Sequence, residues 1–449
     1  MDYLSKEDEE LFRTTTPMTR MIKVSPFEYA DKSQMKDYVL EEITARYSAE
    51  TETTEGDMSW QEFMELGRNF KGEYLAPVDP DRAVFGAYTS GSTGISKLVI
   101  HSSANIVATA YQMSIFIPPS DVQEVWWTPI LPPALIAVTV SMTIFPLSTG
   151  LMVSLDPFCP LENIDIEFMD RKPNFWALIP LYCEMLMSSE RIPEDYDMSH
   201  LRTIGAGAEA MNDRKYAEVE EFFHKHNVQA KLSAGYGQSE GCSNLTLPNP
   251  MFPLEDGCVG MPMTATVLGV FDKDLNELNY GESGELCMTG PSMMLHYSGW
   301  RGEELTEQTL VEHPDGNTWL HTGDEAYITE QGIVHILGRG EIKAYGDKPL
   351  HVMRMETKTV RTPGVKDGFF CLVPDQEHEG YYRPYLFVIL DGTKTLEEVA
   401  ELLKDTLEEH EYPVEIREIT ERPYFHFKTD RKGLTAQILK ELEQAKEEK

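Results

Sequence analysis

Apolar and polar residues alternate along the chain with periods that predict both strands and helices. Strand-like apolar runs occur at residues 83–88, 174–180, 201–207 and 230–237, and helical patterns separate them. Such alternation is typical of α/β layers, so the predicted fold class is α/β with a large layered N-terminal domain. After Gly257, short strands separated by Gly and Asn turns predict a small β subdomain within that domain.

A separate C-terminal lobe is predicted from a second group of elements. The runs FFCLV and YLFVIL are strand-like, and the amphipathic stretch 396–410 predicts a helix. A further strand and a final helix complete an α+β unit of ordinary domain size. We therefore expect an N-terminal domain over residues 1–337 and a small α+β C-terminal domain over residues 338–449.

The longest apolar stretch raises the question of a membrane span. Residues 125–155 carry no charged side chain, which is long enough to cross a bilayer. However, Pro132 and Pro133 lie at the start of its most apolar part, and Pro146 and Gly150 interrupt it. These breakers predict a buried helix at about 134–145, then a turn and a buried strand, and no membrane span.

The composition restricts the classes of function. The chain has 449 residues, with 39 basic and 75 acidic residues and a net charge of −36. Such acidity repels phosphate backbones and anionic lipids, so nucleic acid is not an expected partner. The six cysteines form no C-x-x-C pair and indicate neither a disulfide framework nor a zinc knot. No secretory segment is visible near Met1, so a cytoplasmic location is expected.

A loop of glycines and hydroxyl residues follows the apolar run at 83–88. It reads Thr89-Ser90-Gly91-Ser92-Thr93-Gly94 and is followed by Lys97. Glycines let backbone N–H groups converge on phosphate oxygens, hydroxyls add donors, and the lysine adds a positive charge. The spacing is not that of a Walker loop, and a flexible Ser/Gly turn is the alternative interpretation.

Two other glycine motifs admit different chemistries. Residues 235–241, GYGQSEG, contain G-x-S-x-G, which in a nucleophile elbow would make Ser239 a hydrolase nucleophile. Residues 205–210, GAGAEA, match the dinucleotide fingerprint G-x-G-x-x-A, but the acidic residue that such a site needs is not distinct. Neither motif decides the function alone.

Three further segments complete an ordered set of motifs. They are TGD ending at Asp324, GRGE with Arg339, and KTDR beginning at Lys428, each of which alone indicates only a turn or a solvated charge cluster. In this order, with the glycine motifs, the chain resembles the adenylate-forming superfamily of acyl-CoA synthetases, peptide-synthetase adenylation domains and luciferases. The resemblance runs from about Phe85 to Leu434, with a short segment before the phosphate loop.

The resemblance implies a nucleotide site. The loop and its lysine would hold the β- and γ-phosphates of ATP, a second group would enclose the adenine, and a third would bind the ribose. In that order, the implied ATP-binding residues are Thr89, Ser90, Gly91, Ser92, Thr93, Gly94 and Lys97; Gly207, Ala208, Glu209 and Tyr236; and Asp324 and Arg339.

The resemblance also implies the catalytic groups. Ser239 and Glu240 would contact the α-phosphate and Mg²⁺, with Glu240 as the metal ligand. Lys428 would be the catalytic lysine of a mobile C-terminal lid, bridging the carboxylate and the α-phosphate. Glu341 falls at the hinge position.

The acid substrate is expected to be apolar. By similarity, its pocket would include Leu135, Gly205, Ala206 and Gly235. No acidic residue lies within 125–155, where amino-acid-activating relatives carry an aspartate, so a substrate ammonium would be buried without a partner. A hydrophobic aromatic or medium aliphatic acid is therefore expected.

The predicted activity is conversion of this acid to acyl-AMP and transfer to a thiol. The expected partners are the acid, ATP, and CoA or a carrier-protein thiol, and a homodimer is compatible with the sequence. Two alternatives come from other classes. One is a serine hydrolase using Ser239, and the other is a non-catalytic nucleotide-binding protein.

Overall fold

The computed structural model of this protein describes most of the chain. The described residues are 10, 13–14, 21–25, 27–29, 31–46, 56–73, 75–89, 96–117, 122–207, 211–247, 257–339, 343–425 and 428–447. The chain divides into two compact units, one of residues 1–79 with 156–160 and the other of residues 80–155 with 161–449.

The first unit contains short elements near the start of the chain. They are the parallel pair β1 (Ile22–Lys23) and β2 (Met58–Ser59), a 3₁₀ turn (Lys32–Gln34), α2 (Asp37–Arg46) and α3 (Trp60–Asn69). Helix α3 begins with a capping box, in which the Ser59 hydroxyl accepts the Glu62 N–H and the Glu62 carboxylate accepts the Ser59 N–H at 2.8 Å. Such a box satisfies donors that the first turn of a helix leaves without partners.

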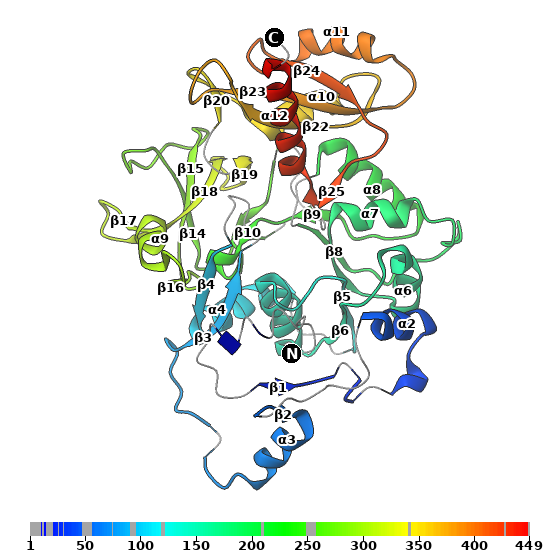
Figure 1. Cartoon of the computed structure of the whole chain (residues 1–449), viewed down its shortest axis with the longest axis vertical. Helices are drawn as coiled ribbons and strands as arrows, with labels where there is room; N and C mark the ends of the chain where they lie inside the picture. Colours follow the sequence, from blue (N-terminus) through cyan, green and yellow to red (C-terminus); the bar gives the residue numbers. More distant parts are fainter. Residues whose placement is uncertain are drawn as a thin grey trace. The chain divides into compact units, whose positions relative to one another are not determined.

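A five-stranded sheet with the order β6-β5-β7-β8-β9 organises the second unit (Figure 1). The bounds are β5 (Val125–Pro129), β6 (Met152–Asp156), β7 (Phe175–Leu178), β8 (Thr203–Ala206), β9 (Leu232–Ala234), α6 (Ile164–Arg171), α7 (Pro180–Met187) and α8 (Asp213–Lys225). Strands β5, β7, β8 and β9 pair in parallel. The sheet and helices enclose a core in which Trp127, Phe168 and Trp176 are buried, and the predicted α/β class is confirmed.

Most of the uncharged stretch at residues 125–155 belongs to the folded core, but the strand predicted to be buried at its end is partly exposed, with Met152 at 44% and Leu155 at 36%. After β5 it forms a π-helix (Ala137–Ile144), continues as α5 (Phe145–Ser148) and ends in β6. Gly150 adopts a φ of 82° in the turn before β6, as predicted. Pro146 does not end the helix as predicted, because it stands in the first turn of α5, where a missing N–H is tolerated, and the helical segment continues to Ser148. Within the described ranges, no helix is long and apolar enough to cross a membrane.

Antiparallel sheets form the remainder of the N-terminal region. One contains β3 (Ala83–Tyr88), β4 (Leu98–Ser102) and β16 (His296–Ser298); the other contains β14 (Val267–Phe271), β15 (Gly284–Thr289), β17 (Leu310–Glu312), β18 (Thr318–Ile328) and β19 (Val334–Arg339). The other elements of this region are the helices α4 (Ser103–Ser114) and α9 (Gly302–Thr309) and the short strands β10 (Gly237–Gln238), β11 (Ser243–Asn244), β12 (Thr246–Leu247) and β13 (Met261–Pro262). The second sheet is the predicted small β subdomain.

The two faces of this second sheet bury different side chains. Leu286, Met288 and Leu320 enter a large core on one face. Cys287 and Trp319 alternate with them and therefore project from the other face, where they form a separate buried cluster with Phe271.

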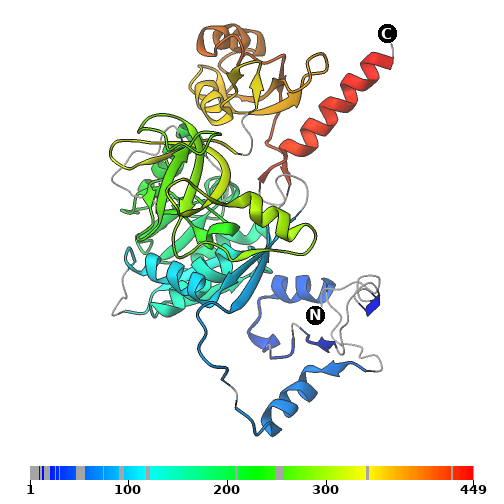
Figure 2. The ribbon, with the colours of Figure 1, turned by 90° about the vertical axis from the view of Figure 1, so that its left-hand side faces the viewer.

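The C-terminal residues form a three-stranded sheet with one antiparallel and one parallel strand pair, in the region drawn from yellow to red in Figure 2. The elements are β20 (Ala344–Tyr345), β21 (Lys348–Pro349), α10 (Val352–Val360), β22 (Val365–Pro374), β23 (Tyr382–Leu390), α11 (Leu396–Thr406), β24 (Glu415–Glu418), β25 (Tyr424–Phe425), β26 (Lys428–Thr429) and α12 (Arg431–Glu447). Two buried clusters here consist only of residues beyond 344. The strands and helices predicted for this region are present, and a domain boundary at residue 338 stays a prediction.

Candidate active site

The glycine-rich loop between β3 and β4 is held together at its base. The Thr89 N–H donates to the Lys97 carbonyl at 2.9 Å, and the Thr89 hydroxyl accepts the Lys97 N–H at 3.0 Å. The Ser96 hydroxyl also donates to the Thr89 carbonyl. These bonds extend the antiparallel β3–β4 pairing by one step and fix where the loop starts and ends. Residues 90–94, which the sequence assigns to phosphate, lie outside the described residues.

The side chain of Lys97 is linked to Glu240 through a tyrosine. The Lys97 Nζ lies 5.0 Å from the centre of the Tyr297 ring, and the Tyr297 hydroxyl donates to Glu240 Oε1 at 2.6 Å. Tyr297 is 3% exposed, and its burial together with the charge of Glu240 raises its pKa, so the phenol stays a donor. A bond this short to a carboxylate is charge-assisted. It occupies Oε1 and leaves Oε2 as the oxygen that can bind a hard cation.

A buried histidine supports the segment that carries Ser239 and Glu240. The Nε2 of His101, on β4, lies 2.7 Å from the Ser239 carbonyl oxygen. Burial lowers the pKa of His101, so the neutral ring donates from Nε2 to that carbonyl. Sequence reasoning missed both His101 and Tyr297. The only signal for His101 was a polar residue in the strand-like run LVIHS, and Tyr297 lies in a strand of only three residues.

Residues 237–244 form a hairpin and not a nucleophile elbow. Strands β10 and β11 pair antiparallel, and the 3₁₀ turn Ser239–Gly241 joins them. A Cβ at Gly237 would lie 1.8 Å from the Ser243 carbonyl oxygen, so the pairing itself requires glycine there. An elbow would place Ser239 between a strand and a helix, so the geometry does not support the hydrolase interpretation.

The ends of β8 and β9 bring three predicted pocket residues together. Gly205 and Ala206 lie opposite Ser233 and Ala234 in the parallel pairing, and the Gly235 N–H donates to the Ala206 carbonyl at 3.2 Å. This is the carboxyl edge of the sheet, where open α/β sheets bind ligands. Gly207 continues from β8, while residues 208 and 209 lie outside the described residues.

The predicted adenine and ribose residues are also neighbours. The Tyr236 hydroxyl donates to Asp324 Oδ2 at 2.5 Å. Asp324 is buried on β18, directly opposite Arg339 of β19 in the strand register. The side chain of Arg339 and all of Glu341 lie outside the described residues.

Lys428 lies on the C-terminal hairpin β25–β26. The Arg422 guanidinium, just before this hairpin, binds the Asp367 carboxylate through two hydrogen bonds of 2.7 and 3.0 Å. The Tyr424 hydroxyl donates to Glu184 of α7 at 3.1 Å. The hairpin is thus fastened both to the C-terminal sheet and to a helix that covers the parallel sheet.

The apolar segment after β5 adjoins two of the motifs. Leu135 is half-buried in the turn before the π-helix, and the neighbouring Ile136 and Val140 are buried. These two pack with Ala87, at the end of β3, and with Cys242, just after the Glu240 turn. Small and apolar side chains therefore surround the base of the phosphate loop, and the assignment of Leu135 to the acyl pocket stays a prediction.

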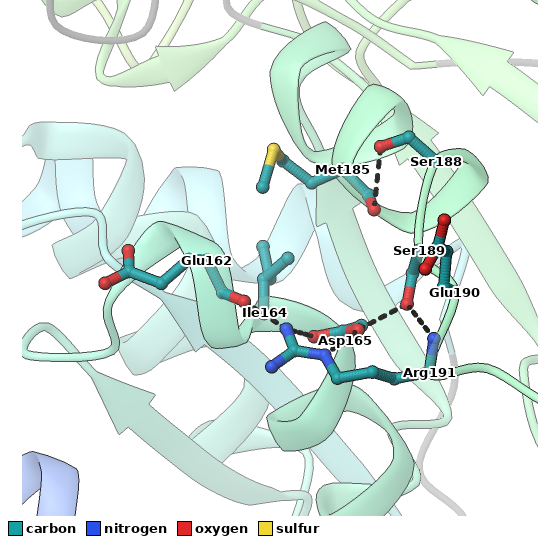
Figure 3. A pocket seen from close by; sticks show the side chains of 8 residues that line it. All are labelled: Glu162, Ile164, Asp165, Met185, Ser188, Ser189, Glu190 and Arg191. Atoms are coloured by element: carbon teal, nitrogen blue, oxygen red, sulfur yellow. Dashed lines mark hydrogen bonds and ion pairs between the residues drawn. The ribbon is translucent and has the colours of Figure 1, made fainter.

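A surface pocket of about 320 Å³ lies away from these residues, beside α6 and α7 (Figure 3). Its most buried charged group is already paired, because Arg191 reaches both oxygens of Asp165, at 2.5 and 2.9 Å, and the Ser189 hydroxyl donates to the same carboxylate. Burial acts to raise the pKa of Asp165, but these hydrogen bonds outweigh it and lower the pKa. We interpret the pair as a structural clamp.

Comparison with known proteins shows which proteins this chain is similar to. A long-chain-fatty-acid–CoA ligase of Escherichia coli O157:H7 is 27% identical over 320 residues, covering 69% of this chain and 54% of that protein. The 4-coumarate–CoA ligase 2 of Nicotiana tabacum is 25% identical, and the match covers 72% of this chain and 58% of that protein. The chain thus spans little more than half the length of these relatives.

The structure of ATP-bound MatB from Rhodopseudomonas palustris superposes with a TM-score of 0.74 at 20% identity, covering 98% of this chain and 82% of that one. At this identity the likeness establishes the fold. The sequence profile described as "AMP-binding enzyme" matches residues 18–298, which is more than half of the chain and contains the phosphate loop, the strand-end glycines and the Glu240 hairpin. From this match and the shared fold it follows that the chain belongs to the AMP-binding enzyme family.

Proposed function

We propose that this chain uses ATP and Mg²⁺ to convert a hydrophobic carboxylic acid into its acyl-adenylate, and then transfers the acyl group to the thiol of CoA. The observation that carries the proposal is the contact sequence from Lys97 through Tyr297 to Glu240. It joins the base of a phosphate-binding loop to a carboxylate suited to a metal. The Tyr236–Asp324 bond supplies the matching nucleoside side of the site.

The reaction needs positive charge because its two substrates repel each other. A carboxylate oxygen attacks the α-phosphorus of ATP, the bond from that phosphorus to pyrophosphate breaks, and the product is the acyl-adenylate. Attack by the CoA thiolate on the acyl carbon then releases AMP. Little of this requires covalent catalysis by the protein, so positioning and electrostatics supply most of the rate. In a chain with a net charge of −36, that positive charge has to be local.

Lys97 and Lys428 are the residues of this chain that supply it. Lys97 would neutralise the β- and γ-phosphates, and its ammonium contacts the Tyr297 ring. Lys428 would bridge the attacking carboxylate and the α-phosphate. Its hairpin belongs to a region with its own hydrophobic clusters, which supports a lid over residues 338–449 that can reorient between the two half-reactions.

Glu240 fits a magnesium ion. Its carboxylate offers hard oxygen, and the hydrogen bond from Tyr297 fixes its orientation while leaving Oε2 available. A bound Mg²⁺ would neutralise phosphate charge next to the α-phosphorus.

The acid is expected to be apolar, as the segment with Leu135, Ile136 and Val140 is uncharged and packs against Ala87. The names of the two relatives point the same way, since one ligates long-chain fatty acids and the other 4-coumarate. CoA is our proposed acceptor on this basis, with a carrier-protein thiol as the alternative outcome. All six cysteines are buried and none is in a disulfide within the described residues, which suits a reducing cytoplasm. A homodimer is compatible with this proposal.

ATP–pyrophosphate exchange across a panel of carboxylic acids tests the proposal. Exchange should require an acid and Mg²⁺, and adding CoA should yield a thioester that chromatography detects. Lys97→Ala should abolish exchange, whereas Lys231→Ala, which changes an exposed lysine just before β9, should leave it unchanged. Absence of acid-dependent exchange across the panel would refute the activity. Exchange without formation of a CoA thioester would indicate that the acceptor is the thiol of a carrier protein.

A further inference from the structure

A second cluster of chemically reactive side chains lies in the antiparallel sheet. Ligand atoms of Cys287, His313 and His321 all lie within 4.8 Å of one another. Cys287 on β15 and His321 on β18 are direct partners in the strand register, so their side chains project from the same face. His313 comes from the tight turn between β17 and β18, whose closure is a hydrogen bond from the His313 N–H to the Asn317 carbonyl at 3.0 Å.

The two imidazoles are oriented toward each other. The Nε2 atoms of His313 and His321 are 2.9 Å apart, and the Nδ1 of His321 lies 2.9 Å from Glu285 Oε2. The carboxylate therefore holds the proton on Nδ1 and leaves the Nε2 lone pair of His321 directed at His313. Glu285 is itself fixed, because its other oxygen accepts the Gly323 N–H at 3.0 Å. A carboxylate that orients a histidine in this way is typical of metal sites.

The His313 side of this cluster is buried, whereas the side formed by His321 and Glu285 is partly exposed to solvent. His313 is 3% exposed, its Nδ1 has no hydrogen-bond partner, and its ring lies 4.5 Å from the centre of Phe271 and 5.7 Å from that of Trp319. The side chains of His321 and Glu285 remain 14% and 37% exposed. An ion can therefore enter from the His321 side, where a water molecule can complete its coordination.

We infer that Cys287, His313 and His321 bind a zinc-type transition-metal ion, with Glu285 as the positioning residue for His321. One sulfur and two imidazole nitrogens favour zinc and its neighbours over magnesium or calcium, which prefer oxygen. Two nitrogens on one tetrahedral zinc are about 3.3 Å apart. The 2.9 Å between the histidines thus requires only a small separation of the rings. This site shares no ligand with the magnesium site proposed at Glu240 and does not depend on it.

A metal ion bound at this site would have a structural role. It would tie β15, β18 and the β17–β18 turn together, at a place where the buried cluster of Phe271, Cys287 and Trp319 is small. The sulfur also provides a spectroscopic signature that no other ligand of the cluster can give.

The full chain, freed of metal with a chelator and kept reduced, is titrated with Co²⁺ as a probe for Zn²⁺. We expect one equivalent to produce visible bands of tetrahedral cobalt and a near-ultraviolet thiolate-to-cobalt band, both removed by one equivalent of Zn²⁺. Cys287→Ser should abolish the thiolate band. Cys371→Ser, which removes an equally buried free thiol from β22, should keep it. A band that survives in Cys287→Ser, or no band in the parent, would overturn the inference.

A second pair of variants covers the case in which Cys287→Ser fails to fold. Glu285→Gln changes a partly exposed side chain and removes only the charge that orients His321, so Zn²⁺ affinity measured by competition with a chromophoric chelator should fall about 10–100-fold with the stoichiometry unchanged. His321→Gln should bring binding below one equivalent. If both variants bind Zn²⁺ as tightly as the parent, the cluster is only a hydrogen-bonded histidine pair beside a buried thiol.

Discussion

Replacing Tyr297 by phenylalanine tests whether the tyrosine acts through Glu240. The change removes one oxygen and keeps the ring beneath Lys97, so the cation–π contact at 5.0 Å survives while the 2.6 Å bond to Glu240 is lost. Hydrogen bonds to charged groups contribute about 1.5–3 kcal/mol. If this bond orients Glu240 for Mg²⁺, that energy corresponds to a metal affinity lower by about 10- to 150-fold.

The assay is ATP–pyrophosphate exchange measured as a function of Mg²⁺ concentration. For Tyr297→Phe we expect a higher half-saturating Mg²⁺ concentration and a maximal rate that is largely recovered at high Mg²⁺. The matched control is Tyr182→Phe, which removes another buried phenol, one that donates to the Pro129 carbonyl at 3.0 Å in the main core. That variant should lose stability without any change in Mg²⁺ dependence. Identical Mg²⁺ curves for Tyr297→Phe and the parent would refute the reasoning.

Three other outcomes are expected. Lys428→Ala should lower adenylation about 10²–10³-fold while ATP binding measured by calorimetry stays nearly intact, and Lys432→Ala should change neither; normal exchange by Lys428→Ala would rule out its catalytic role. Phenylpropionate should support exchange far better than phenylalanine, because the segment around Leu135 offers no partner for an ammonium, and equal rates would show that the pocket is misassigned. The lowered pKa of Asp165 means that its pairing stabilises the fold above the ordinary aspartate value of 3.8 and is lost as the pH falls through the lowered pKa. Arg191→Gln should therefore lower the free energy of unfolding, measured by denaturant titration, by roughly 1–3 kcal/mol at pH 7 and by less at pH 2. A loss of stability that does not change with pH would contradict this account.

Much of the fold could be predicted from the sequence because its signals are local. Apolar runs located β7, β8 and β9, and Gly150 located the turn before β6. The bounds were less certain, since the predicted helix at 134–145 occupies 137–148 and begins as a π-helix, whose wider hydrogen bonding no residue pattern marks.

The contacts inside the candidate site are harder to predict, because they depend on which strands pair and in what register. Tyr297 meets Glu240 only because β16 adds to β4, and His101 reaches Ser239 from that same strand. Neither residue stands in a motif. By contrast, Tyr236 and Asp324 each stand in a recognisable motif, and the structure adds that they are bonded to each other.

The Cys287 cluster follows the same principle, because strand pairing brings its residues together. The spacing of the cysteines in the sequence indicated no zinc knot. The proposed ligands could not be found that way, because they come from two separate strands and a turn. Only the pairing of β15 with β18 makes Cys287 and His321 neighbours. Glu285 binds both His321 and the N–H of Gly323, where a φ of 71° lets the chain bend just before Asp324. A metal that holds His321 and Glu285 in place therefore also restrains the backbone that presents Asp324 to Tyr236. The two sites would be coupled through this short segment of β18, even though they share no ligand.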